Sequence, residues 1–176
     1  MNVIEFLQDL MSQVPLLIQP LIVALAAAIP FVEGELAAVL GVWAGLHPVI
    51  AAIAAIAGNF ASVFFVVAFG ARIRARIVAR RMQRAALVPA GDVPAIPDAA
   101  PESKGVQRFK RFLVRFGVPG ASLLGPLAIP TQFTSAILVS TGVAKGWVLL
   151  WQGVAIVAWT TLTTLVATGV LALVAG

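Results

Sequence analysis

The apolar residues of the chain form six segments of unequal length, and two of these segments are long. Segments 48–70 and 147–175 exceed the roughly 20 residues that a helix needs to cross a bilayer, so they predict two spanning helices. Because a proline removes a backbone donor and breaks a helix, the remaining segments predict two pairs of short helices, each pair interrupted at Pro30 or Pro130. The four short segments cover residues 14–29, 36–46, 118–129 and 133–142.

The composition is typical of a protein that is embedded in a lipid bilayer. Of the 176 residues, 61% are hydrophobic and 11% are charged, and the mean hydropathy is +1.03, whereas soluble domains average about 25% charged residues. We therefore expect an all-α integral membrane protein without a separate soluble domain. The sequence has no cysteine and one histidine, His47, which excludes thiolate catalysis and multi-histidine metal sites. We expect no metal and no cofactor.

The basic residues indicate how the segments are oriented. Eleven of the twelve lysines and arginines lie between Arg72 and Arg115, and the twelfth is Lys145. The positive-inside rule therefore predicts that residues 71–116 are cytoplasmic and that both termini lie outside. Since this charge flanks membrane segments, we expect membrane lipids rather than nucleic acid as partners.

The chain divides into two similar parts, residues 1–84 and 106–176, joined by a linker. Residues 85–105 contain four prolines and three acids and lack an apolar period, which predicts a flexible cytoplasmic linker. Each part begins with an amphipathic stretch that we expect on the membrane surface. A pair of short segments and one long segment follow in both parts.

Two stretches suggest that the parts are repeats. "AIPFVEGELAAVLGVWAGLHPV" and "AIPTQFTSAILVSTGVAKGWVL" both begin with Ala-Ile-Pro, contain a pair of glycines and enter a long helix. Segment 48–70 ends at cytoplasmic arginines and segment 147–175 starts beside a cytoplasmic lysine, so the two long helices run in opposite directions. We therefore expect an inverted repeat, as in secondary transporters, with a re-entrant hairpin and a long transmembrane helix in each half. The glycine pairs, Gly41–Gly45 and Gly142–Gly146, are expected to be close-packing sites, within one chain or in a homodimer.

The two hairpins would bring their tips together near the membrane centre. The first tip carries two acids, which are expensive in a membrane and therefore indicate function, although a structural role as helix caps stays open. Apolar surroundings favour the protonated form of a carboxylic acid, which allows proton exchange during transport. We rank Glu35 first and Glu33 second, with Pro30, Gly34 and Pro130 shaping the tips. The predicted substrate or proton-coupling site consists of Glu35, Glu33, Gln132, Thr131, Thr134, Ser135, Asn59 and Gln152.

Two motifs resemble a known family. "FVEGELAAVLGVWAG" is similar to the region that opens DedA-family membrane proteins, and "RFLVRFGVPGASLLGPLAIPTQFTSAILVSTG" resembles their second hairpin. The short "FGVPG…IP" pattern is similar to the small multidrug export branch. The resemblance implies a bacterial inner-membrane protein with paired re-entrant hairpins that transports a polyprenyl-phosphate lipid carrier, and it assigns the family's functional glutamate to Glu35. The chain departs from the family at Ser62 and Gln132, where DedA proteins carry an aspartate and arginines.

Several functions remain open at this point. The first is a transporter of a lipid phosphate or another amphipathic substrate, coupled to protons through the acids. The second is a small multidrug exporter of cationic amphiphiles, which two acids would suit by charge, and the third is a membrane scaffold without transport. We expect no enzyme, because the sequence lacks a paired aspartate, a Ser–His set and a metal cluster.

Overall fold

The computed structural model describes residues 9, 12–86 and 104–175, and those residues contain helices and no strand. The all-α prediction is confirmed for this part of the chain. The predicted N-terminal surface helix and most of the predicted linker lie outside the described residues. The helices are α2 (Gln19–Ala27), α3 (Glu33–Trp43), α4 (Pro48–Ala86), α5 (Lys104–Leu124), the 3-10 helix η1 (Gly125–Leu127), α6 (Thr131–Ser140) and α7 (Lys145–Ala175).

The helix boundaries differ from the predicted segments by a few residues. The first hairpin arm is helical only from Gln19, and α3 begins at Glu33 rather than at residue 36. The linker is shorter than 85–105 at both ends, because residues 85–86 belong to α4 and residues 104–105 to α5.

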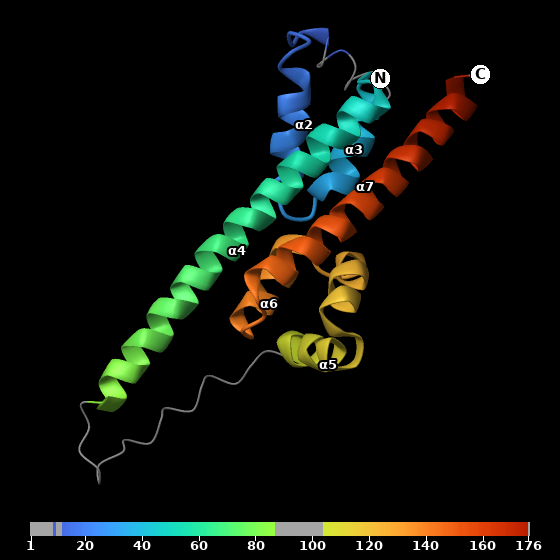
Figure 1. Ribbon diagram of the computed structural model, residues 1–176. Helices are drawn as coiled ribbons and strands as arrows, with labels where there is room; N and C mark the ends of the chain where they lie inside the picture. The colour runs from blue at the N-terminus through green and yellow to red at the C-terminus, as the bar shows by residue number, and fades with distance from the viewer. Residues whose placement is uncertain (1–8, 10–11, 87–103, 176) are drawn as a thin grey trace.

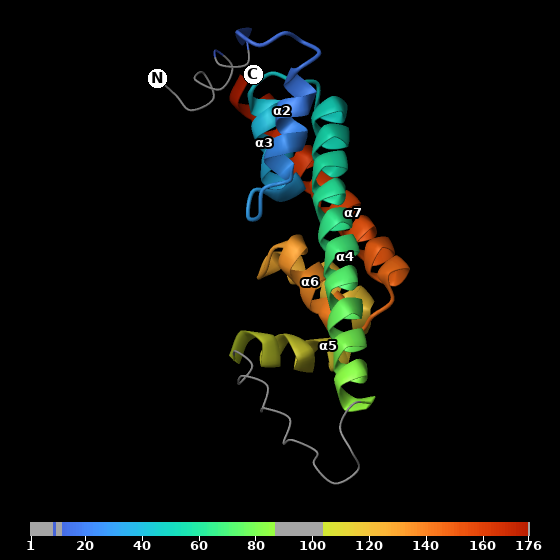
Figure 2. The same ribbon diagram turned by 90° about the vertical axis from the view of Figure 1, so that its left-hand side faces the viewer.

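The two long helices α4 and α7 pack against each other and run in opposite directions through the molecule (Figure 1). Helices α2 and α3 form a hairpin that packs on α4 at one end of this pair. The second half of α5, η1 and α6 form another hairpin towards the opposite end, and the turning points of the two hairpins face each other (Figures 1 and 2).

Two helical stretches are long and apolar enough to cross a membrane. They cover Pro48–Arg80 and Lys145–Leu173, with 33 and 29 residues. At a rise of 1.5 Å per residue, α4 as a whole is about 58 Å long. It is therefore longer than the thickness of a bilayer core, about 30 Å, and its last turns carry the exposed arginines that were identified in the sequence.

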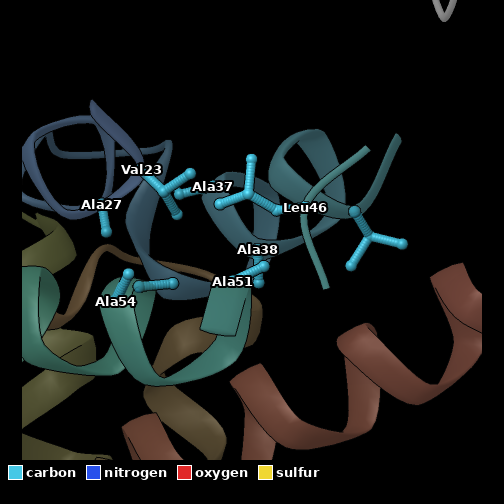
Figure 3. Close-up of a cluster of buried hydrophobic side chains, with 9 residues drawn as sticks. Val23, Ala27, Ala37, Ala38, Leu46, Ala51 and Ala54 are labelled. Atoms are coloured by element: carbon cyan, nitrogen blue, oxygen red, sulfur yellow. The ribbon is translucent and has the colours of Figure 1, made fainter. Parts of the chain in front are cut away.

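Small side chains fill the interior of the first hairpin, and large apolar side chains point outward. Six of the nine buried residues that connect α2, α3 and the start of α4 are alanines (Figure 3). In contrast, Leu25 is 63% exposed, Ile53 is 62% exposed and Leu165 is 66% exposed. The alanines let the helix backbones approach closely, so the contact between these helices depends on small side chains.

Two glycines end the short helices in the same way. Gly45 after α3 has φ +97° and Gly142 after α6 has φ +99°, the left-handed conformation that glycine adopts without penalty. In each case the glycine N–H and the next N–H donate to carbonyls three and five residues back, which is a Schellman motif. Each motif turns the chain into a long helix.

This geometry corrects the predicted pairing of the glycines. The sequence pairs Gly41 with Gly142 and Gly45 with Gly146, whereas the two Schellman motifs match Gly45 with Gly142. A Cβ at Gly41 would lie 3.0 Å from Val23, but a Cβ at Gly45 or Gly146 would contact nothing within 4 Å. Close packing within the chain is therefore confirmed for Gly41, whereas Gly45 and Gly146 have no close neighbour within the chain. A Cβ at Gly142 would lie 2.8 Å from the Arg74 guanidinium.

The second hairpin begins at a break inside α5. Gly117 has φ 67° and ψ −172°, which is not helical, and it separates the basic amphipathic stretch from the hairpin arm that starts at residue 118. The boundary agrees with the sequence prediction. Figure 2 shows the first part of α5 running across the view, whereas α4 runs from top to bottom.

The contact between α3 and α7 gives a first testable prediction. A Cβ at Gly34 would lie 2.3 Å from Thr160 Oγ1 and 3.5 Å from Thr160 Cβ, so Gly34→Ala should lower the free energy of unfolding by about 1–3 kcal/mol through overpacking. Adding Thr160→Ala removes the clashing hydroxyl and should restore most of the loss, whereas Thr160→Val keeps a methyl group in its place and should not. Thermal unfolding in detergent measures both double variants; equal stability of the two would contradict this packing.

Candidate functional site: the joint between the hairpin tips

The turn of the first hairpin holds two residues in an unusual backbone conformation. Phe31 has φ 72° and Glu33 has φ 52°, the left-handed region that non-glycine residues seldom occupy. Such a conformation costs about 1–3 kcal/mol per residue and persists only where the surrounding structure enforces it. Glu33 is the first residue of α3, and its side chain contacts the second hairpin at Thr131.

Glu33 binds the N-terminus of α6. Its Oε1 accepts a hydrogen bond of 2.5 Å from the backbone N–H of Thr131 and a second one from the Thr131 hydroxyl. Thr131 is the first residue of α6, where backbone N–H groups lack partners within the helix and the helix dipole is positive. The carboxyl group thus lies at the positive end of the helix dipole and accepts two hydrogen bonds. Glu33 is only 7% exposed.

The amide side chains of α4 and α6 extend this contact. Gln132 Nε2 donates to Asn59 Oδ1 over 3.2 Å, and the Thr131 hydroxyl oxygen lies 3.2 Å from the same atom. Asn59 is fully buried. We call Glu33, Asn59, Thr131 and Gln132 the polar joint, because they connect α3, α4 and α6.

The predicted approach of the two tips is therefore confirmed. Besides the polar joint, the rings of Phe31 and Phe133 lie next to each other, with centroids 6.1 Å apart. Pro30 lies in the first turn, and Pro130 directly precedes α6, as the sequence predicted for residues that shape the tips.

Glu35 lies outside the polar joint, although the sequence ranked it first. Both of its carboxylate oxygens are buried and have no hydrogen-bond partner among the described residues. The hydroxyl of Thr163 lies 3.5 Å from its backbone carbonyl oxygen. The structure thus brings Glu33, and not Glu35, into contact with the second hairpin.

The other predicted site residues are buried, and their contacts differ. The Ser135 hydroxyl donates to the Thr131 carbonyl over 2.7 Å, which is a bond within α6. Thr134 is buried beside Gly125 of η1. Gln152 is fully buried on α7, one turn from Val148 and one turn from Ile156, which pack in the core of the second hairpin.

Many buried polar atoms around the tips lack a hydrogen-bond partner in the described part of the chain. Buried polar atoms are normally bonded in native proteins, so each exception calls for an explanation such as a bound molecule, water or ion. These atoms are therefore candidates for contact with a bound molecule, water or ion. The side-chain atoms concerned are Glu35 Oε1 and Oε2, Asn59 Nδ2, Ser122 Oγ, Gln132 Oε1, Thr134 Oγ1, Gln152 Nε2 and Oε1, and Thr160 Oγ1.

Two of these residues were not in the predicted site. Ser122 stands in an apolar stretch of α5 and carries no sequence signal by itself, whereas Thr160 is one of several threonines of α7 that look alike in the sequence. Thr163, Thr164 and Thr168 do bond to carbonyls of their own helix, as expected for packing residues. Thr160 differs because it faces Gly34 at the first tip.

The acidic group of the polar joint is Glu33, and the partial positive charge opposite it comes from the N-terminus of α6. Among the described residues, no group of three or more His, Cys, Asp or Glu side chains could hold a metal ion. The groups present at the joint are a carboxylic acid, amides, a hydroxyl and backbone N–H groups, which can exchange a proton and form hydrogen bonds.

No protein-family model, curated protein or solved structure matches this chain.

Proposed function

We propose that this chain is a small integral membrane transporter of the DedA-like type, and that the polar joint is part of its transport site. The observation that carries the proposal is the buried carboxylate of Glu33 bound to the N-terminus of α6, between two broken hairpins. Ionisable groups inside a membrane are costly and usually serve transport or coupling. A scaffold without transport would not need them at this place.

The arrangement of side chains supports a membrane location. The two long apolar helices and the large exposed side chains of α2, α4 and α7 suit a lipid environment, while polar groups gather inside. The exposed arginines at the end of α4 suit the cytoplasmic side of a bacterial inner membrane, with both termini outside. Under this proposal the halves are inverted repeats and the hairpins are re-entrant.

The polar joint would lie near the middle of the bilayer. Asn59 has eleven residues of the apolar segment 48–70 before it and eleven after it. Thr160, which faces the first tip, likewise falls within one residue of the centre of segment 147–175. Irregular backbone at such a depth is tolerated where it lines a protein-enclosed cavity, and transporters place their sites there.

An apolar groove on the same two long helices supports an amphipathic substrate. The groove has a volume of about 620 Å³. Phe60 and Gly153 line it, and each directly follows a polar residue of the site region, Asn59 and Gln152. The groove and the polar groups thus occupy neighbouring faces of α4 and α7, which suits a molecule with a polar head and a hydrocarbon chain. Its lining consists of Ile56, Phe60, Leu149, Leu150, Gly153, Val154, Val157 and Ala158.

We favour an anionic head group, such as a lipid phosphate, because the N-terminus of α6 supplies the positive end of a helix dipole without a lysine or arginine. A cationic amphiphile is the second candidate. The unpartnered carboxylate of Glu35 favours it, since a buried carboxylate could bind a cation. Protons are the proposed coupling ion in both cases, carried by Glu33 or Glu35.

Transport by the purified full chain in proteoliposomes tests the proposal. We expect movement of a short-chain polyprenyl phosphate across the membrane at a rate at least ten times that of empty liposomes, and slower or no movement of a cationic amphiphile. Faster movement of the cation would favour the export alternative. If neither compound moves in vesicles that contain folded protein, the transport proposal is wrong.

A further inference from the structure

Glu33 makes the contacts with α6 that a bound anion would make. A single oxygen, Oε1, accepts from the Thr131 backbone N–H and from the Thr131 hydroxyl. Free oxyanions bind to helix N-termini through the same donors. The carboxylate comes from the opposite hairpin, 98 residues earlier in the sequence, so it acts as a ligand that one half of the chain presents to the other.

Asn59 provides an independent indication that this place binds an anion. Its side chain is fully buried and touches both Thr131 and Gln132, yet its Nδ2 group has no acceptor among the described residues. A buried amide N–H without an acceptor costs roughly 1–3 kcal/mol. The Asn59 atom that lies next to Thr131 and Gln132 is Oδ1, and Nδ2 belongs to the same amide. A free oxyanion, unlike the tethered carboxylate, can turn its second oxygen towards Nδ2 while the first keeps the donors of Thr131.

We infer that Glu33 is a tethered occupant of an oxyanion subsite, which is formed by the Thr131 backbone N–H, the Thr131 hydroxyl and the Asn59 amide. The inference rests on the proposed function: the anionic head of the transported molecule takes the place of the Glu33 carboxylate when this side chain withdraws. Two negative charges at these donors would repel each other, so Glu33 and the substrate cannot occupy the subsite at the same time.

The backbone of the first tip suits such an exchange. Glu33 and Phe31 are both held at positive φ, and the hydrogen bonds to α6 help to offset the cost of that conformation. Loss of these bonds to a competing anion removes this compensation, and the tip can then relax towards ordinary backbone angles. Binding at α6 would thereby change the conformation of the first hairpin.

The experiment removes the tethered ligand and supplies a free one. Glu33→Gly deletes the carboxylate and suits the left-handed backbone at this position, so the subsite becomes accessible without added strain. Sodium formate is the probe, with sodium chloride at equal ionic strength as the salt control. We expect formate at ten times its dissociation constant to raise the unfolding midpoint of the purified full-length variant by about 3–6 °C. The wild type should not respond.

Matched variants make the result specific. Glu35→Ala also removes one carboxylate from α3 but leaves Glu33 on α6, so formate should not stabilise it. Thr131→Val in the Glu33→Gly background removes the hydroxyl donor and should at least halve the formate shift. If Glu33→Gly folds poorly, the yield of folded protein in formate relative to chloride is the readout, and the same increase is expected.

The inference is wrong if formate stabilises Glu33→Gly no more than chloride does, or if it stabilises Glu35→Ala or the wild type equally. Because this experiment measures stability, its outcome is separate from the transport assay. A formate effect without transport would leave the subsite standing and remove the transport proposal. Transport without a formate effect would remove the subsite and leave the transport proposal standing.

Discussion

Gly58→Ala is expected to cause the largest loss of stability of any single methyl group added to this chain. A Cβ at Gly58 would lie 1.9 Å from the carbonyl oxygen of Ala24 and 2.7 Å from its Cα. These are backbone atoms of α2, so no side-chain rotation can make room, and α2 must move away from α4. We expect the free energy of unfolding to fall by about 3 kcal/mol, the upper end for overpacking.

The consequence should extend to the polar joint. The Ala24 carbonyl accepts a hydrogen bond from the N–H of Ala28, at the end of α2 where the first tip begins. Displacement of α2 therefore displaces the segment that holds Glu33 in its strained conformation. Thermal unfolding of the purified variant in detergent should show a midpoint about 6–12 °C below that of the wild type.

Gly70→Ala is the matched control, because it makes the same exchange in the same helix. A Cβ at Gly70 would lie 3.8 Å from Val139, an ordinary contact, and alanine favours a helix interior by about 0.5–1 kcal/mol over glycine. This variant should be as stable as the wild type or slightly more stable. Equal midpoints for the two variants would show that α2 and α4 do not approach each other as closely as the structure has them.

The coarse plan of the molecule could be predicted from the sequence because hydrophobic length and proline position act locally. The two long apolar segments correspond to α4 and α7, and the breaks at Pro30 and Pro130 separate the short helices. The end of each short helix was harder to assign. Gly41, Gly45, Gly142 and Gly146 look alike in the sequence, and only the backbone angles separate the turn glycines from the packing glycine.

The content of the candidate site was easier to predict than its contacts. Thr131 and Gln132 were predicted from their place at the tip of the second hairpin, and Asn59 from its place as a polar residue inside an apolar segment. The roles of Glu33 and Glu35 could not be separated in that way, since both precede the same apolar run. Their difference arises from the left-handed backbone at Glu33, a tertiary feature that glutamate does not favour and that the sequence therefore does not indicate.

Glu33→Gln is expected to have the largest effect on function. The amide keeps the length of the side chain and can still accept from Thr131 through its oxygen, so the protein should fold and reconstitute at normal levels. It cannot exchange a proton, which the proposed coupling through this residue requires. We expect transport in proteoliposomes to fall by about 10–100-fold, which corresponds to about 1.4–2.8 kcal/mol.

Glu35→Gln distinguishes a specific role of the joint from a general need for acids at the tip. It makes the same chemical change two residues away, at a carboxylate with no hydrogen-bond partner among the described residues. Under our proposal for an anionic substrate, this variant should retain at least half of the wild-type rate at equal protein density. A full rate for Glu33→Gln together with loss of transport for Glu35→Gln would reverse the assignment. In that case the unpartnered carboxylate, and not the one bound to α6, is the group that meets the substrate or the proton.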